Sequence, residues 1–280
     1  MVAAASATMV DMCGRFAVTT DPALLAEKLQ ALDETAAAGD GPNFNVAPTT
    51  TISAVVKRHS EPGDESTRRI RSMRWGLVPS WARAGADGAP ERKGPLLINA
   101  RAETVTSSPA FRGAARHKRC LVPMNGWYEW QPTGAVRGPK TPYYLYAADG
   151  GLLLMAGLWS AWRPGNAPAT TPPLLSCTII TTDAVGPLAR IHDRMPLSVS
   201  AGDWDRWLDP DAPVDEGLLA GHGDSDRIAV REVSTLVNNT ANNGPELIEP
   251  ADTHQGAPLS RVAGRTNEML TTTDPDRGSP

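Results

Sequence analysis

Short apolar runs bounded by glycine and proline constrain the fold of this chain more than any other feature of its sequence. The runs have the length and the β-branched or aromatic content of strands, and 25 glycines and 25 prolines in 280 residues punctuate them repeatedly. We therefore expect strands over residues 51–57, 119–124, 143–146, 152–159 and 177–181. Between two of these runs, Asp149-Gly150 is a hairpin signal.

Helical signals are fewer and shorter. Asp21 followed by Pro22 predicts a cap and a first turn for a helix over residues 23–29, and further short helices are expected over 108–118, 185–191 and 203–208. Glycine, proline and charge predict surface loops at residues 60–69, 83–95, 132–139, 163–173 and 209–226. The expected fold class is α+β: a single domain built on a curved, mainly antiparallel β-sheet or barrel with short covering helices.

Length and composition set the domain organisation. With 41% hydrophobic residues, the chain can bury a full core, and its apolar pattern ends near Asp252. We expect one catalytic domain over residues 13–251, a disordered tail over 252–280, and a leader over 1–12 that is absent from the working protein or removed. No run has the length of a membrane span and the leader lacks the pattern of a secretory signal, so the expected location is the cytoplasm.

Cysteine usage directs attention to Cys13. Cys13, Cys120 and Cys177 lie too far apart for paired zinc knuckles, and a disulfide framework is not expected. Because Cys13 follows Met12, translation from Met12 or cleavage of the leader would make it the first residue. An N-terminal cysteine carries an amine and a thiol that can both bond to one aldehyde carbon and close a thiazolidine ring. As an internal residue, Cys13 would be a small apolar residue beside a strand.

Five blocks carry residue types typical of a functional site. They are CGRF at 13–16, NFNVAP at 43–48, RWGLVPSW at 74–81 with INARAET at 98–104, RCLVPMNGWYEW at 119–130, and IHDRMP at 191–196. In this order they resemble the SRAP family, the SOS response-associated peptidase or abasic-site-processing family, whose members crosslink themselves to abasic sites in single-stranded DNA. The resemblance runs from Cys13 to about Pro250.

The resemblance implies a nucleophilic N-terminal cysteine at Cys13 and a site completed by Asn99, Glu129 and His192. Histidine exchanges protons near neutral pH and could open the closed sugar, while Glu129, inside an aromatic strand, should have a raised pKa and accept the proton of the attacking amine. Asn99 could orient the amine or a sugar hydroxyl. Each residue also has an ordinary explanation, as a helix-end histidine, a solvent-facing glutamate and a turn asparagine.

The expected partner is single-stranded DNA containing abasic sites, which places the protein at the nucleoid when it acts. Arg15, Arg101 and Arg194 could hold phosphates, because the arginine fork suits phosphate oxygens, and Trp75 and Trp81 could stack on bases. Core packing explains the two tryptophans at least as well. The net charge of −4 argues against a protein coated in basic surface but leaves a basic cleft open. No metal or organic cofactor is implied.

Two other functions stay open. A cysteine peptidase would use Cys13 and His192 as nucleophile and base, with Asn99 as orienter, and would work with a blocked N-terminus. A non-enzymatic DNA-binding module would bind reversibly and release its DNA as salt rises. The family also carries an autopeptidase assignment, meaning self-removal of the residues ahead of the cysteine, which would expose the amine of Cys13.

Overall fold

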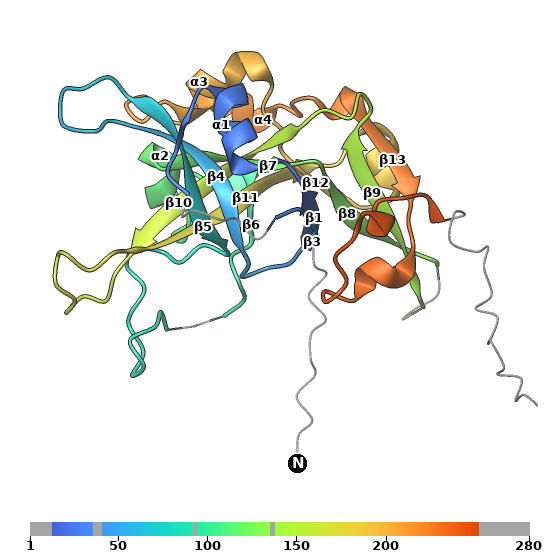
Figure 1. Ribbon diagram of the computed structural model, residues 1–280, viewed down its shortest axis with the longest axis horizontal. Helices are drawn as coiled ribbons and strands as arrows, with labels where there is room; N and C mark the ends of the chain where they lie inside the picture. The colour runs from blue at the N-terminus through green and yellow to red at the C-terminus, as the bar shows by residue number, and fades with distance from the viewer. Residues whose placement is uncertain (1–12, 36–40, 92–93, 135–137, 252–280) are drawn as a thin grey trace, which may run out of the picture.

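A computed structural model describes residues 13–35, 41–91, 94–134 and 138–251 of the chain. The expected leader over 1–12 and the expected tail over 252–280 lie outside the described residues. Within them, the strands form two curved sheets, and short helices cover their margins (Figure 1). The expected α+β fold class is confirmed.

The smaller sheet is antiparallel and places the start of the described chain beside a central strand. Its order is β13-β9-β8-β1-β3. The strands are β1 (Arg15–Val18), β3 (Asn43–Val46), β8 (Gly126–Pro132), β9 (Lys140–Ala147) and β13 (Ile228–Glu232). Because Arg15 on β1 pairs with Tyr128 on β8, the residues just before β1 lie next to Glu129.

The larger sheet closes on itself. Its strands are β2 (Leu32–Asp33), β4 (Thr51–Arg58), β5 (Thr67–Trp75), β6 (Asn99–Arg101), β7 (Arg119–Met124), β10 (Leu153–Trp162), β11 (Leu174–Asp183) and β12 (Arg194–Pro196). Antiparallel neighbours run from β11 through β10, β7 and β4 to β5, and β5 then pairs with β11 in parallel. The expected barrel is therefore present, with parallel pairings of β11 to β5 and β6 that the sequence did not predict.

Short helices pack against both sheets. The α-helices are α1 (Pro22–Leu29), α2 (Arg112–His117), α3 (Trp204–Leu208) and α4 (Glu216–Ala220). The 3-10 helices are η1 (Ala102–Thr104), η2 (Gly186–Arg190), η3 (Ala201–Asp203), η4 (Ser225–Arg227), η5 (Thr235–Asn238) and η6 (Pro245–Leu247). In the described part of the chain, no helix is long and apolar enough to cross a membrane.

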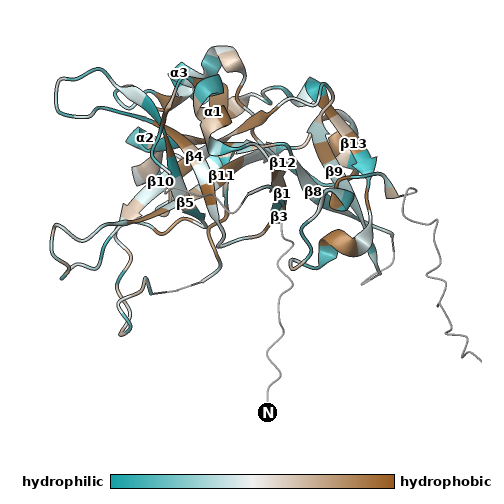
Figure 2. Cartoon of the chain, viewed as in Figure 1, coloured by the Kyte–Doolittle hydropathy of each residue, from teal (hydrophilic) through white to brown (hydrophobic). Residues whose placement is uncertain are grey.

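Buried side chains form two large clusters, one on each side of the closed sheet. The first contains Cys13, Phe16, Trp75 and Trp127, so the residue of greatest chemical interest belongs to the core between the sheets. The second lies under the helices and includes Trp207 of α3. Figure 2 shows hydrophobic colouring on β4 and on α1, and hydrophilic colouring on α2 and α3.

The local predictions meet the structure with mixed success. All five expected strands are present, and the Asp21 side chain accepts the N–H of Ala23 at 2.8 Å, as expected of a cap. The helices expected over 108–118 and 203–208 are shorter, and the one over 185–191 is the 3-10 helix η2. The loop expected over 60–69 ends early because β5 begins at Thr67, and the loop over 209–226 contains α4.

The hairpin expected at Asp149-Gly150 is wrong. The turn itself forms, because Gly150 adopts a φ of +70° and donates its N–H to the carbonyl of Ala147 at 2.8 Å. However, β9 belongs to the smaller sheet and β10 to the larger one. The chain therefore uses this turn to pass between sheets, not to pair neighbouring strands.

Candidate active site around Cys13 and Glu129

Cys13 lies two residues before the start of β1 and is 3% exposed. Its φ of +44° lies in the left-handed region, which non-glycine residues adopt at a cost of about 1 kcal/mol or more. Two contacts with β8 offset that cost. The main-chain N–H of Cys13 donates to Oε1 of Glu129 at 3.0 Å, and its Sγ–H donates to the same oxygen at 2.6 Å.

Glu129 is a carboxyl group in an apolar setting. It is 2% exposed, and within the described residues its Oε2 is buried and makes no hydrogen bond. Burial raises the pKa of Glu129 to about 8, against the lowering effect of the two hydrogen bonds from Cys13. The expectation of a raised pKa is confirmed, and this group can gain or lose a proton near neutral pH.

The thiol of Cys13 is held in its neutral form. Burial raises its pKa well above the ordinary value, and the adjacent Glu129 carboxyl adds to that rise. Two charged residues have smaller effects: Arg194 lowers the pKa of the thiol, and Asp193 raises it. The thiol therefore needs a proton acceptor beside it before it can react, and Oε1 of Glu129 is in that position.

His192 lies between η2 and β12, with its side chain 10% exposed. Its Nδ1 accepts the N–H of Arg194 at 3.0 Å, which places the proton of a neutral ring on Nε2. Oδ1 of Asp193 also lies 3.0 Å from Nδ1, a contact that requires a protonated Nδ1. Only one of the two can hold at a time. We favour the first because Asp193 is 85% exposed and free to turn into solvent.

Asn99 is the first residue of β6. Both β6 and β12, the strand that follows His192, pair with β11. Asn99 pairs with Ile179 on β11, and β12 pairs with the last residues of the same strand. The preceding residue, Ile98, packs against the cluster that contains Cys13. The structure thus brings Cys13 and Glu129 into contact and carries Asn99 and His192 on elements that flank one end of β11.

Arg194 is the buried centre of an ion cluster whose two carboxylates, Glu103 and Asp183, are exposed. It is 8% exposed, and its two terminal nitrogens donate to both carboxylate oxygens of Glu103 at 2.9 and 3.0 Å. It also donates to Asp183 and, at 2.7 Å, to the carbonyl of Thr181. A DNA phosphate would have to displace these partners, so the phosphate contact expected of Arg194 stays a prediction. Its observed role is to tie β12 to β11 and to η1.

The remaining residues that were expected to contact DNA differ in exposure. Trp75 is fully buried, donates its indole N–H to the carbonyl of Ile98 at 3.0 Å and meets Phe16 edge-on at 5.0 Å. The base-stacking role predicted for Trp75 is therefore wrong, because no face of its ring is accessible. Trp81 is 68% exposed and Arg101 is also exposed, so both can meet a ligand.

Arg15 sits between these extremes. It is half-buried, and its guanidinium donates to Oδ1 of Asn45 at 2.9 Å and to the carbonyl of Val237 at 3.0 Å.

Sequence reasoning missed the supporting residues Glu103 and Asp193. The available signal was their position inside the blocks that carry Asn99 and His192, where a carboxylate beside arginine or histidine indicates an ion pair.

The sequence of this chain is similar to a family model and to those of named proteins. A family model described as SOS response associated peptidase (SRAP) matches residues 12–240. The chain is 36% identical over 244 residues to the abasic site processing protein YoqW of Bacillus subtilis (strain 168), covering 85% of this chain and 99% of YoqW. It is 32% identical over 234 residues to the abasic site processing protein HMCES of Gallus gallus, covering 75% of this chain and 67% of HMCES.

Solved structures share the fold. A protein from Bacteroides thetaiotaomicron aligns with a TM-score of 0.67 at 22% identity, covering 85% of this chain and 100% of that one. At this identity the likeness supports the fold alone. A phage-related protein from Bordetella bronchiseptica aligns with a TM-score of 0.59 at 27% identity, covering 80% of this chain and 95% of that one. By its family match and by the identity of its relatives, this chain belongs to the SRAP family.

Proposed function

We propose that this protein processes abasic sites in single-stranded DNA by forming a covalent thiazolidine crosslink through Cys13. One observation carries the proposal: the main-chain nitrogen and the Sγ of Cys13 both lie within hydrogen-bond distance of Oε1 of Glu129, at 3.0 and 2.6 Å. These are the two atoms that must bond to one aldehyde carbon, and each must lose a proton. The relatives named abasic site processing proteins supply the substrate class.

The first bond forms between nitrogen and carbon. An opened abasic deoxyribose presents an aldehyde at C1′, and the free α-amine of Cys13 adds to it to give a carbinolamine. Loss of one water then leaves an iminium. Glu129, whose pKa burial raises to about 8, accepts a proton from the amine and returns one to the departing hydroxyl.

The second bond closes the ring. Sγ adds to C1′ of the iminium, the electron pair of the C=N bond moves to nitrogen, and the thiol proton passes through Oε1 of Glu129, its hydrogen-bond partner. The net reaction joins one amine, one thiol and one aldehyde and releases one water. Because the closed ring has no iminium to promote β-elimination, the DNA strand stays intact.

His192 and Asn99 act on the sugar in this proposal. In its protonated form, with Nδ1–H turned to Oδ1 of Asp193 at 3.0 Å, His192 can give its Nε2 proton to the ring oxygen of the closed hemiacetal as C1′ opens. The ring is then neutral, and Nδ1 accepts the N–H of Arg194. Asn99 offers both a donor and an acceptor without adding charge, and so can orient a sugar hydroxyl. Oε2 of Glu129, buried and without a hydrogen bond in the described residues, is a further acceptor for the substrate.

The amine of Cys13 exists only when no residue precedes it. In the full chain its nitrogen is an amide that donates to Glu129, and hydrolysis of the preceding peptide bond, with one water consumed, would turn the same atom into the amine. We therefore include removal of residues 1–12 in the proposal, whether by a start at Met12 and loss of methionine or by self-cleavage. A protein with this activity would work where cellular DNA lies.

The peptidase alternative has weaker support. A cysteine peptidase needs a thiolate, usually made by a hydrogen-bonded histidine that lowers the pKa of the thiol. Here the Cys13 thiol donates to Glu129 and its pKa is raised. This arrangement suits a thiol that reacts late, after an iminium has formed, more than one that attacks an amide directly.

A denaturing gel tests the proposal. The protein begun at Met12, the full 280-residue chain and Cys13→Ala are each incubated with single-stranded DNA bearing one abasic site, and with the same strand undamaged. We expect a heat-stable shifted band only with damaged DNA and a free Cys13. No such band from the Met12 form, with loss of methionine verified by mass spectrometry, would refute crosslinking and favour peptidase or simple binding activity.

A further inference from the structure

The last part of the described chain packs on the back of the smaller sheet. Residues 235–243, which begin with η5 and which we call the covering segment, lie beside β8 and β9 (Figure 1). Val237 of this segment is fully buried with Tyr128 of β8, whereas Trp127 belongs to the cluster of Cys13. Because side chains alternate across a strand, the covering segment lies on the face opposite to the candidate site.

Two side chains next to the reacting pair bind the covering segment. Arg15, two residues after Cys13, donates to two main-chain carbonyls of the segment at 3.0 and 3.4 Å. Trp130, the neighbour of Glu129, donates its indole N–H to Oδ1 of Asn238 at 2.7 Å. The guanidinium of Arg15 also lies 5.9 Å from the ring centre of Trp130. Asn238, whose carbonyl is one of the two acceptors, therefore contacts both the strand of Cys13 and the strand of Glu129.

Asn45 of β3 fixes the main chain of the covering segment. It is 4% exposed, and its Nδ2 lies 3.1–3.2 Å from three carbonyl oxygens, those of Val237, Asn239 and Asn242. Its Oδ1 accepts the guanidinium of Arg15 at 2.9 Å. Because both ends of this amide have partners, turning it would break bonds on both sides. The covering segment, β3 and β1 are thereby held together.

A chain that starts at Cys13 needs such an anchor. Terminal residues are poorly ordered unless they are tied down, and Cys13 is the terminus in the proposed working form. Its φ of +44° is costly and persists only where the surrounding contacts determine it. Gly14, which is conformationally permissive and has no side chain, follows it. Arg15 therefore carries the first side chain after Cys13 that can hold the start of the chain in place.

We propose that Arg15 and Asn238 are positioning residues, which hold Cys13 against Glu129 from the covering segment and thereby set the rate of crosslinking. The proposal rests on the proposed function for the reaction itself, whereas the placement of Cys13 is measurable without DNA. It gives Arg15 a role other than a phosphate contact. A phosphate contact depends on the charge of Arg15, but positioning depends on the reach of its planar fork to several acceptors at once.

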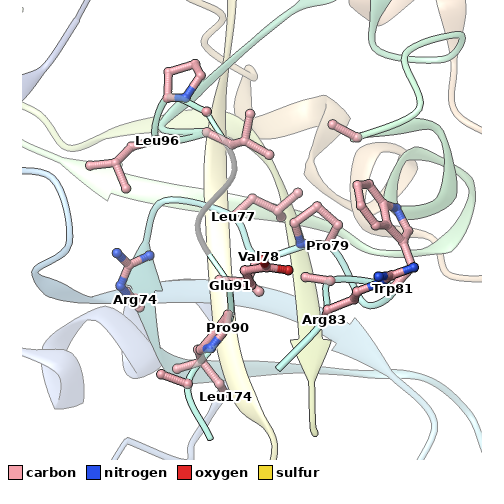
Figure 3. A pocket seen from close by; sticks show the side chains of 16 residues that line it. Arg74, Leu77, Val78, Pro79, Trp81, Arg83, Pro90, Glu91, Leu96 and Leu174 are labelled. Carbon is pink, nitrogen blue, oxygen red and sulfur yellow. The ribbon is translucent and has the colours of Figure 1, made fainter. Parts of the chain in front are cut away.

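The cavity shown in Figure 3 has a different lining. Its volume is about 930 Å³, with Arg74 at one end of the lining and Trp81 at the other. No residue of the covering segment is among its described lining residues. Substitution of Asn238 therefore leaves the lining of this cavity unchanged.

Alkylation of Cys13 by iodoacetamide, followed by mass spectrometry, measures its placement in the protein that starts with this residue. We expect Asn238→Ala and Arg15→Lys each to alkylate about tenfold faster, because loss of a hydrogen bond lets the chain start open more often. Cys120 and Cys177, both 0% exposed, should stay protected. Asn238→Asp keeps an oxygen acceptor for the indole N–H and should return the rate toward that of the parent. Asn238 is exposed, so both of its variants should fold.

Crosslinking kinetics test the consequence for the reaction. In Asn238→Ala and Arg15→Lys, the rate at saturating damaged single-stranded DNA should fall about tenfold. The DNA concentration for half-maximal rate, and the affinity for undamaged DNA measured by fluorescence anisotropy, should stay near parental. Asn239→Ala is the matched control, because this exposed side chain accepts the N–H of Ala241 inside the covering segment, and its carbonyl is kept for Asn45.

Three results would overturn the proposal. The first is alkylation of Cys13 in Asn238→Ala and Arg15→Lys at the rate of Asn239→Ala. The second is equal acceleration at all three cysteines, which would show a general loss of stability. The third is a parental rate at saturation in Arg15→Lys with weaker binding of undamaged DNA, which would make Arg15 a phosphate contact. If no form of the protein crosslinks, the proposed function fails, while alkylation still decides what positions Cys13.

Discussion

The Sγ of Cys13 lies 2.6 Å from Oε1 of Glu129, although 116 positions separate the two residues in the sequence. The pairing of β1 with β8 makes this contact, since Arg15 opposite Tyr128 fixes the register of the segment that starts with Cys13. The same oxygen receives the main-chain N–H of Cys13. One carboxyl group therefore serves both atoms that thiazolidine formation requires.

Replacement of Glu129 by glutamine should slow crosslinking by about 10²–10⁴-fold, because an amide of the same shape cannot relay a proton. Binding of undamaged single-stranded DNA should not change. The rate is measured as crosslinked product against time on denaturing gels, with the Met12 form as parent. Glu232→Gln, an exposed glutamate on β13 of the same sheet, is the matched control and should react at the parental rate. A parental rate in Glu129→Gln would remove Glu129 from the mechanism.

The raised pKa of Glu129 should make stability depend on pH in the chain that retains the residues before Cys13. The neutral carboxyl is stabilised by burial relative to the charged form, so this contribution is complete below the ordinary value of 4.5 and is lost as pH rises through about 8. Glutamine does not titrate. The free energy of unfolding of Glu129→Gln minus that of the parent should therefore increase from about pH 5 to about pH 9, by at most about 1.4 kcal/mol per pH unit.

Urea unfolding at several pH values measures this difference. The Cys13 thiol does not interfere, because its pKa is raised well above the ordinary 9.0 and it stays neutral in this range. A difference that is constant with pH would show that Glu129 titrates normally in the folded chain. Glu232→Gln again provides the control, with no pH-dependent difference expected from an exposed strand glutamate.

Local patterns predicted the strands well and their partners poorly. The run 119–124 is buried at every position, so its apolar, β-branched character identified β7 with the correct bounds. The turn at Asp149-Gly150 was also predicted correctly. Whether the two strands that flank it pair with each other depends on which sheet each strand joins. That is decided by contacts such as Ala147 with Ile228 and Leu153 with Met124, which no short window contains.

The candidate site shows the same division. The residue types at Cys13, Glu129 and His192 were visible in their blocks, and the aromatic neighbours of Glu129 correctly predicted burial and a raised pKa. The sequence did not show that both donors of Cys13 meet one oxygen. Nor did it show that Arg194 would form an ion pair with Glu103, from which it is separated by 91 positions.

Replacement of Arg194 by lysine should lower both stability and crosslinking rate. Lysine cannot span both oxygens of Glu103 and still reach Asp183 and Thr181. The exposed carboxylates of Glu103 and Asp183 can turn to water, but the carbonyl of Thr181, in a buried contact, loses its partner at a cost of about 1–3 kcal/mol. Because the N–H of Arg194 fixes Nδ1 of His192, displacement of the main chain would also disturb the proton carrier. Thermal unfolding and the crosslinking rate are measured together.

Arg227→Lys is the matched control for Arg194→Lys. Arg227 also pairs with two carboxylates, Asp149 and Asp224, but its side chain is 42% exposed, and exposed pairs contribute about 0–1 kcal/mol. We expect near-parental stability and rate in that variant. If Arg194→Lys behaves in the same way, the ion cluster of Arg194 does not position His192.

The two tryptophans six positions apart should separate stability from binding. Trp75 is enclosed by the core, so Trp75→Ala should cost about 3–5 kcal/mol of unfolding free energy through the cavity that it leaves. Trp81 is 68% exposed, so Trp81→Ala should change stability by about 0.5 kcal/mol or less, as surface substitutions do, while weakening single-strand binding. Urea unfolding and anisotropy on the same preparations measure both quantities. Loss of DNA affinity in a folded Trp75→Phe variant, with normal affinity in Trp81→Ala, would reverse the assignment and move base stacking back to Trp75.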